Sequence, residues 1–136
     1  MCSVRNVLAV RLLVQLLTEN IRMIDDIFCK IIKGELKADS VFEDDDFLVI
    51  RDIKPAAPVH LLVIPKQHFD SLAEFELKDA GLLGRALLIA EKIAKEQGLG
   101  RGYRLVLNEG EHGGKLVPHL HIHILGGKHL GPKIVQ

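Results

Sequence analysis

The most constraining feature of this 136-residue chain is a run, Val117 to Leu125, in which histidine and aliphatic residues alternate. Strict alternation is typical of a strand with one buried face, because successive side chains point to opposite faces of a sheet. We therefore expect a strand over His119–Leu125. Its core-facing side chains are the aliphatic ones, Leu120, Ile122 and Ile124. The opposite face then carries three imidazoles in a row, from His119, His121 and His123.

Periodicity and turn residues predict the other elements of the fold. Four further strands are expected at Val41–Glu43, Phe47–Asp52, Val59–Ile64 and Tyr103–Asn108, and two helices at Ile27–Lys33 and Leu77–Gln97. The long helix has an expected buried stripe of Leu82, Ala86, Leu87, Ala90, Ile93 and Ala94. This order favours the α+β class, with a five-stranded, mostly antiparallel sheet, one long helix and one short helix.

Composition narrows the function classes. Lys plus Arg and Asp plus Glu balance at 18 each, which argues against a protein that grips nucleic acid electrostatically. Two cysteines are too few for a disulfide framework. The absence of Trp and the single Tyr argue against an aromatic platform for bases. Seven histidines, five of them between His112 and His129, point instead to chemistry on imidazole.

The first 22 residues differ from the rest in charge, because they contain three arginines and only one glutamate. Their apolar run is too short for a membrane span, so we expect no membrane association. Residues 1–22 are interpreted as an extension upstream of a domain at 23–136. A transit peptide and a structural helix are the alternatives. We expect a cytoplasmic protein, or an organellar one if the extension is a transit peptide.

The imidazole row has three possible interpretations: a solvated face, a metal site, or a site of covalent catalysis. Along a strand, same-face neighbours lie about 6.8 Å apart, whereas zinc holds its nitrogens at about 2.0–2.1 Å. Three such histidines can hardly converge on one ion, so we expect no metal and no other cofactor. A neutral imidazole is a good nucleophile towards phosphorus, and the glycine-rich loop Gly110–Lys115 offers backbone N–H groups for a phosphate.

The alternating pattern His119–Leu125 resembles the signature of the histidine triad (HIT) superfamily of nucleotide hydrolases and transferases. The segments Asp26–Ile32 and Arg51–His60 resemble its opening helix and its ribose-binding strand and loop. The segments Leu107–Gly110, His112–Gly114 and Leu125–Gly127 are similar to the Hint branch. The resemblance implies a five-stranded HIT-like fold and a homodimer. Three departures concern the leaving group: Leu116 stands where animal Hint proteins carry Ser, Pro118 precedes the triad, and the C-terminal tail is short.

The resemblance also implies roles for individual residues. His121 is the expected nucleophile, His119 and His123 the expected phosphate and leaving-group contacts, and His60 the expected support of His119. Asp52 is expected to hold the ribose hydroxyls. Phe28, Ile31 and Ile53 are expected to form the apolar wall of a purine pocket. The expected phosphate contacts are Asn108, Gly114, Lys115 and Leu116. His68, His112 and His129 match no such position and are interpreted as surface residues.

The implied reaction is hydrolysis of the P–N bond of purine nucleoside 5′-phosphoramidates, adenosine favoured, through a nucleotidyl-histidine intermediate. Two alternatives are kept. One is a dinucleoside polyphosphate hydrolase or nucleotidyl transferase with the same nucleophile. The pair Gly126-Gly127 after the triad argues against this alternative. The other is a non-catalytic nucleotide-binding interaction protein.

Overall fold

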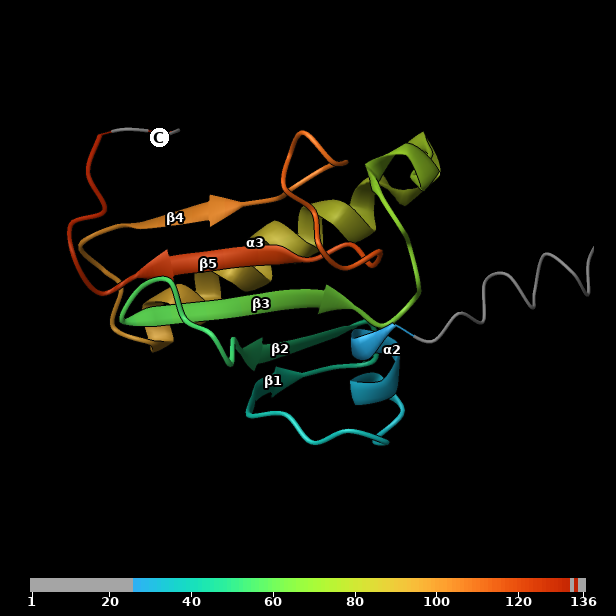
Figure 1. Cartoon of the computed structure of the whole chain (residues 1–136), viewed down its shortest axis with the longest axis horizontal. Coiled ribbons are helices and arrows are strands. Elements are labelled where there is room, and N and C mark those ends of the chain that lie inside the picture. The colour runs from blue at the N-terminus through green and yellow to red at the C-terminus, as the bar shows by residue number, and fades with distance from the viewer. Residues whose placement is uncertain (1–25, 133, 135–136) are drawn as a thin grey trace, which may run out of the picture.

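The computed structural model describes residues 26–132 and 134, so the expectations for residues 1–22 lie outside the described residues. Five strands form one sheet in the order β1-β2-β3-β5-β4, and every neighbouring pair is antiparallel (Figure 1). The strands are β1 (Ser40–Glu43), β2 (Phe47–Arg51), β3 (Val59–Pro65), β4 (Tyr103–Val106) and β5 (Ile122–Gly126). The expected fold class is confirmed.

Two helices flank the sheet, α2 (Ile27–Ile32) and α3 (Ala80–Glu96). Asp26 caps the N-terminus of α2, since its Oδ1 accepts a 2.8 Å hydrogen bond from the backbone N–H of Cys29, and Gly34 follows the helix at φ 81°. Helix α3 is preceded by two 3₁₀ turns, Leu72–Glu74 and Leu77–Asp79, which explains why it starts three residues later than expected. No helix among the described residues is both long and apolar enough to cross a membrane.

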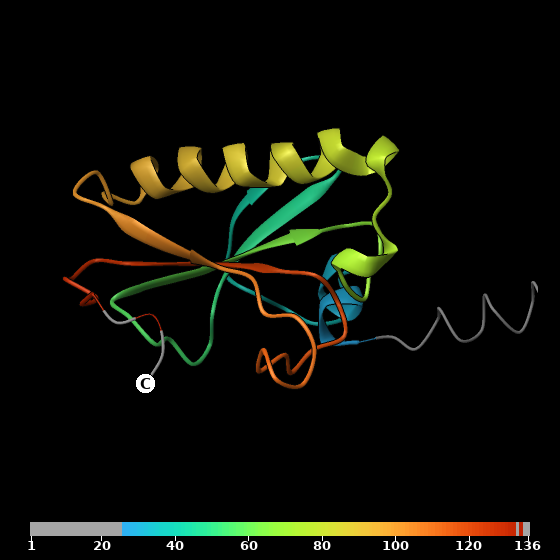
Figure 2. The same cartoon turned by 90° about the horizontal axis from the view of Figure 1, so that it is seen from above.

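The two faces of the sheet have different covers. Helix α3 lies along one face, while α2 and the loop between β4 and β5 lie on the other (Figure 2). Alternation along the strands divides the core accordingly. The side chains towards α3 include Phe47, Val49, Leu61, Val63, Ile122 and Ile124. Those towards α2 are Leu48, Ile50, Leu62 and Ile64, which pack with Phe28. On this face the covering helix, α2, has only six residues, and a pocket lies between it and the sheet.

Two expectations about these elements are wrong. Strand β5 begins at Ile122 rather than His119, because the chain bends just before it: the N–H of His119 donates to the carbonyl of Val117 at 2.8 Å. The N–H of Leu120 donates to Phe69 O at 2.7 Å, outside the β3–β5 ladder. The second error is Leu87, which is 48% exposed instead of lying in the buried stripe of α3.

Candidate active site

A pocket of about 340 Å³ lies between α2 and the sheet. Nine of the twelve expected site residues line it: Phe28, Ile31, Asp52, Ile53, Asn108, Gly114, Leu116, His121 and His123. The lining also includes Ile27, Leu36, Lys37 and Ala38, which no sequence pattern marked. Helix α2 contributes apolar side chains to this lining. The two imidazoles, Asp52 and Asn108 contribute polar ones.

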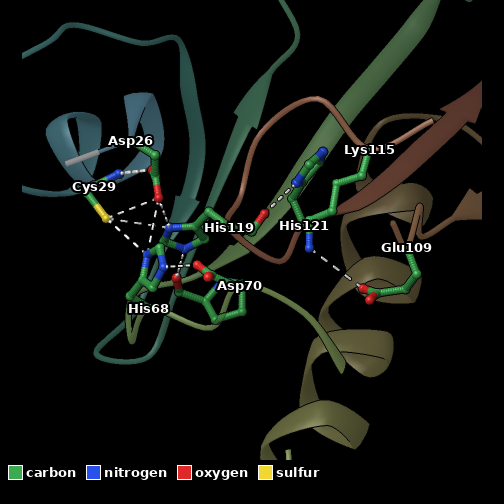
Figure 3. A network of polar contacts seen from close by, with 9 residues as sticks. Asp26, Cys29, His68, Asp70, Glu109, Lys115, His119 and His121 are labelled. Atoms are coloured by element: carbon green, nitrogen blue, oxygen red, sulfur yellow. Dashed lines mark hydrogen bonds and ion pairs between the residues drawn. The ribbon is translucent and has the colours of Figure 1, made fainter. Parts of the chain in front are cut away.

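His121 has one ring nitrogen committed and the other available. Its Nδ1 lies 2.7 Å from the backbone carbonyl of His119, and a carbonyl can only accept, so Nδ1 carries the hydrogen (Figure 3). The lone pair is then on Nε2, for which no hydrogen bond to another described residue is found. Burial lowers the pKa of His121, and the positive charge of Lys115 adds to this effect. The ring is therefore neutral near pH 7 and keeps a nucleophilic nitrogen.

His123 has the opposite tautomer, because a chain of hydrogen bonds fixes it. The N–H of Ala56 donates to His60 Nδ1 at 3.0 Å, so His60 Nε2 carries the hydrogen. That Nε2 lies 2.8 Å from His123 Nδ1, which must accept. His123 Nε2 is left as an N–H donor; Asn108 Nδ2, which is also a donor, lies 3.5 Å away, so the two nitrogens make no hydrogen bond in this tautomer. Burial, together with the nearby His121 and His60, lowers the pKa of His123 to about 4.

Asp52 follows β2 directly and lines the same pocket. Its Oδ1 accepts from the Lys54 N–H at 2.8 Å, and its Oδ2 lies 3.4 Å from His60 Nε2. The side chain is 20% exposed, so unused lone pairs face the pocket and can accept from hydroxyl groups. The nearby carboxylate opposes the effect of burial on His60, whose pKa is still lowered.

The loop between β4 and β5 has a tight turn that brings backbone to the pocket. Gly110 and Gly114 adopt positive φ angles of 66° and 76°, and the N–H of Lys115 closes the turn on Gly110 O at 3.1 Å. A Cβ on Gly113 would lie 2.1 Å from Glu109 O, so only glycine fits there. Lys115 lines the neighbouring pocket instead, with its Nζ 3.8 Å from Glu109 Oε1.

His119 lies outside the pocket lining and is fully buried. Its Nε2 bonds the carbonyl of Pro65 at 2.8 Å and its Nδ1 lies 3.2 Å from Asp26 Oδ2. The side chain therefore has no nitrogen left for the expected contact with a phosphate. The expected support of His119 by His60 is wrong as well, because His60 bonds His123. What His119 offers the site is its backbone carbonyl, the acceptor for His121.

The interpretation of His68 as a surface residue is also wrong. Its side chain is only 22% exposed, and its Nδ1 lies 3.1 Å from Asp26 Oδ2 (Figure 3). Asp26, Cys29, His68 and His119 each present one metal-ligating atom within 4.8 Å of the others, and so do Asp52, His60 and His123. Burial by itself would raise the pKa of Asp26, but the Cys29 N–H and His119 lower it. The sequence carried no signal for the first group, since its members come from three separate segments.

Comparisons with known proteins identify the family. Residues 25–134 match the family model described as "Scavenger mRNA decapping enzyme C-term binding". An uncharacterized HIT-like protein of Synechococcus elongatus is 53% identical over 106 residues, covering 78% of this chain and 93% of the relative.

Two solved structures are similar over most of their length. The HIT family hydrolase from Clostridium thermocellum aligns with a TM-score of 0.80 at 44% identity, covering 83% of this chain and 99% of that one. The HIT family hydrolase from Legionella pneumophila aligns with a TM-score of 0.77 at 45% identity, covering 79% and 97%. On these grounds, together with the antiparallel sheet and the His119–His121–His123 segment, the chain belongs to the histidine triad (HIT) superfamily and is similar to its hydrolases.

Proposed function

We propose that this protein hydrolyses the P–N bond of purine nucleoside 5′-phosphoramidates, adenosine favoured, as in the Hint branch of the superfamily. The observation that carries the proposal is the tautomer of His121. Its Nδ1 is held by the carbonyl of His119 at 2.7 Å, and its Nε2 faces the pocket with a free lone pair. A neutral imidazole in this state attacks phosphorus without first losing a proton.

The reaction has two steps in this proposal. His121 Nε2 forms a bond to phosphorus, the P–N bond breaks with its electron pair on nitrogen, and the leaving amine takes a proton from solvent water. Water then attacks the nucleotidyl-histidine, which releases the nucleoside monophosphate and restores the imidazole. In this proposal the N–H of His123 Nε2 donates a hydrogen bond to a phosphoryl oxygen, whereas the N–H groups of Gly114 and Lys115 already donate to Glu111 O and Gly110 O within the turn. The hydrogen bond from His60 sets the tautomer of His123 before substrate arrives.

The nucleoside fits the remaining walls of the pocket. Phe28, Ile31 and Ile53 supply apolar surface for a flat base, and Ile53 is 85% exposed, so it can close over the base from outside. Asp52 offers carboxylate lone pairs to the two ribose hydroxyls. A pocket of about 340 Å³ is at the lower end of the range for small-molecule sites, which suits a mononucleotide.

The test is a comparison of substrates on the purified full-length chain. We expect kcat/KM for adenosine 5′-phosphoramidate to exceed that for diadenosine polyphosphates by at least about tenfold, and turnover to vanish in His121→Asn. Greater activity on the polyphosphate would move the protein to the alternative hydrolase or transferase. Adenosine monophosphate binding without turnover of either substrate would leave a nucleotide-binding interaction protein.

We also propose that the protein is cytoplasmic. A separate proposal is that two copies of the chain pair through β4. β4 is an edge strand of the described sheet, and edge strands expose unpaired backbone groups. A groove beside it is lined by apolar side chains, namely Leu72, Leu83, Leu87, Leu105, Val106, Leu107 and Ile122. Light scattering should give twice the chain mass for the native protein and for Lys92→Glu, and a lower mass for Leu87→Glu. A native monomer would contradict the pairing.

A further inference from the structure

Two adjoining hollows lie at the far end of the sheet from α2, between the turn that leads into β4 and the segment that follows β5 (Figure 1). Their volumes are about 320 and 230 Å³, and four residues line both of them, namely Arg101, Gly102, Lys128 and His129. We call the two hollows together the basic trough. None of its lining residues lines the candidate active-site pocket, so the trough is separate from that pocket.

The lining side chains of the trough that carry a charge at neutral pH are all cationic. They belong to Arg101, Arg104 and Lys128, and the lining contains neither Asp nor Glu. In the described part of the chain, neither Arg101 nor Lys128 forms an ion pair, whereas Arg51 and Arg85 each pair with an aspartate. A hollow lined by charges of one sign attracts ions of the other sign. The trough therefore favours an anionic ligand.

Two hydrogen bonds to Gly131 hold the segment after β5 in place beside β4. The carbonyl of Gly131 accepts from Arg104 Nη2 at 2.8 Å, and its N–H donates to His129 Nδ1 at 3.0 Å. Because Nδ1 accepts, the hydrogen of the neutral His129 ring is on Nε2, which is left as a donor. Arg104 is thus used within the protein, and the side chains of Arg101, Lys128 and His129 are the donors that remain for a ligand.

Close packing at the glycine pair after the histidines brings the cations of two segments together. A Cβ on Gly126 would lie 2.8 Å from Leu99 Cδ2, and a Cβ on Gly127 would lie 2.9 Å from Pro58 Cβ. Gly127 also has a φ of 91°, a backbone conformation that residues with a side chain rarely adopt. The chain after β5 therefore passes close to the turn before β4, and Lys128 lines the same hollow as the arginine of that turn.

We propose that the basic trough binds an oligophosphate, a chain of two or more phosphate groups, through Arg101, Lys128 and His129. A guanidinium donates two parallel hydrogen bonds to phosphate oxygens, and an ammonium binds them as a point charge. Donors spread over two adjoining hollows match an anion with several charged groups better than a single phosphate. The zero net charge of the whole chain argues against a long nucleic acid as the ligand.

Two sources share this chemistry, free inorganic oligophosphate and the phosphate chain of a nucleoside triphosphate. Because Arg101 and Lys128 are exposed, dissolved salt screens their attraction for either anion. We therefore expect the dissociation constant to rise several-fold between about 50 and about 300 mM salt. No residue of the trough has a role in the proposed P–N hydrolysis, so a failure of one proposal leaves the other standing.

Isothermal titration calorimetry of the full-length chain with sodium tripolyphosphate measures the affinity. The double variant Arg101→Gln/Lys128→Gln should bind at least about tenfold more weakly than the native chain, because it lacks the charge-assisted hydrogen bonds. The matched variant Lys78→Gln/Lys92→Gln loses the same charge from exposed side chains outside the trough and should bind like the native chain. Equal weakening in the two variants would overturn the proposal, since net charge alone would then explain the binding. Circular dichroism and light scattering check that both variants keep the native fold and mass.

Amide NMR spectra of the ¹⁵N-labelled chain locate the ligand without reference to activity. Tripolyphosphate should shift the signals of Gly102, Gly127 and Gly131, which line the trough. Shifts confined to Gly110 and Gly113, in the loop between β4 and β5, would place the anion near the active-site pocket alone and overturn the proposal. Unchanged spectra at millimolar tripolyphosphate would overturn it as well. Adenosine triphosphate separates the sources: trough shifts would show that a nucleotide supplies the phosphate chain, and their absence would leave free oligophosphate as the ligand.

Discussion

Protonation of His123 should destabilise the fold over a defined range of pH. Burial and the neighbouring His121 and His60 lower its pKa from 6.5 to about 4. Because the folded pKa lies below the unfolded one, the unfolded chain binds this proton first, and stability is lost as pH falls from about 6.5 to 4. The difference of 2.5 pKa units, from 6.5 minus 4, corresponds to about 3 kcal/mol.

The assay is urea unfolding of the native chain and of His123→Asn at a series of pH values between 7 and 4. Asn retains an oxygen that can accept from His60 Nε2, and it does not titrate. His60 and His121, whose pKa values are also lowered, remain in both proteins. The difference between the two plots of unfolding free energy against pH is therefore due to His123. The native chain should lose about 3 kcal/mol more than the variant by pH 4. Parallel stability curves would refute the reasoning.

Three further predictions concern the pocket and its loop. The acid limb of kcat/KM should fall below pH 6.5, because the pKa of His121 is lowered and its neutral form is the nucleophile; a limb centred above 6.5 would contradict this. Gly113→Ala should cost about 1–3 kcal/mol in urea unfolding, since its Cβ would meet Glu109 O at 2.1 Å, whereas Gly84→Ala in open space on α3 should stabilise by up to about 1 kcal/mol. Equal effects of the two would count against the loop geometry. Asp52→Ala should raise KM for adenosine 5′-phosphoramidate about tenfold or more, with a smaller effect for a substrate that lacks both ribose hydroxyls; an equal effect on both would rule out a ribose contact.

The number and approximate positions of the strands, and most of the pocket residues, could be predicted from the sequence, but the order of the strands in the sheet could not. Alternation identifies the two faces only in β5, whereas β2 and β3 are buried on both faces and read as continuous apolar runs, which do not show which side chain points to which face. The positions of Phe28, Asp52 and Asn108 in the pocket followed from resemblance to a family rather than from spacing. The sequence does not by itself bring α2 and the loop after β4 to one face.

The bend before β5 could not be predicted from the alternation of side chains. Alternation continues through His119, so nothing local shows that the ladder with β3 starts only at Ile122. What ends it is tertiary: His119 bonds Pro65 O, and Leu120 bonds Phe69 O. The same bend separates His119 from the other two histidines. For that reason the expected row of three imidazoles is in fact a pair, with the third in a separate cluster.

The central claim is that His121 Nε2 forms a covalent bond to phosphorus, and intact-mass measurement tests it most directly. The native chain is mixed with adenosine 5′-phosphoramidate for a few milliseconds and quenched in base, because phosphorus–imidazole bonds break in acid. We predict a species heavier by one adenylyl group, located on His121 by fragmentation, and its absence from His121→Asn. Turnover without that species, or with the adenylyl group on another residue, would contradict the account.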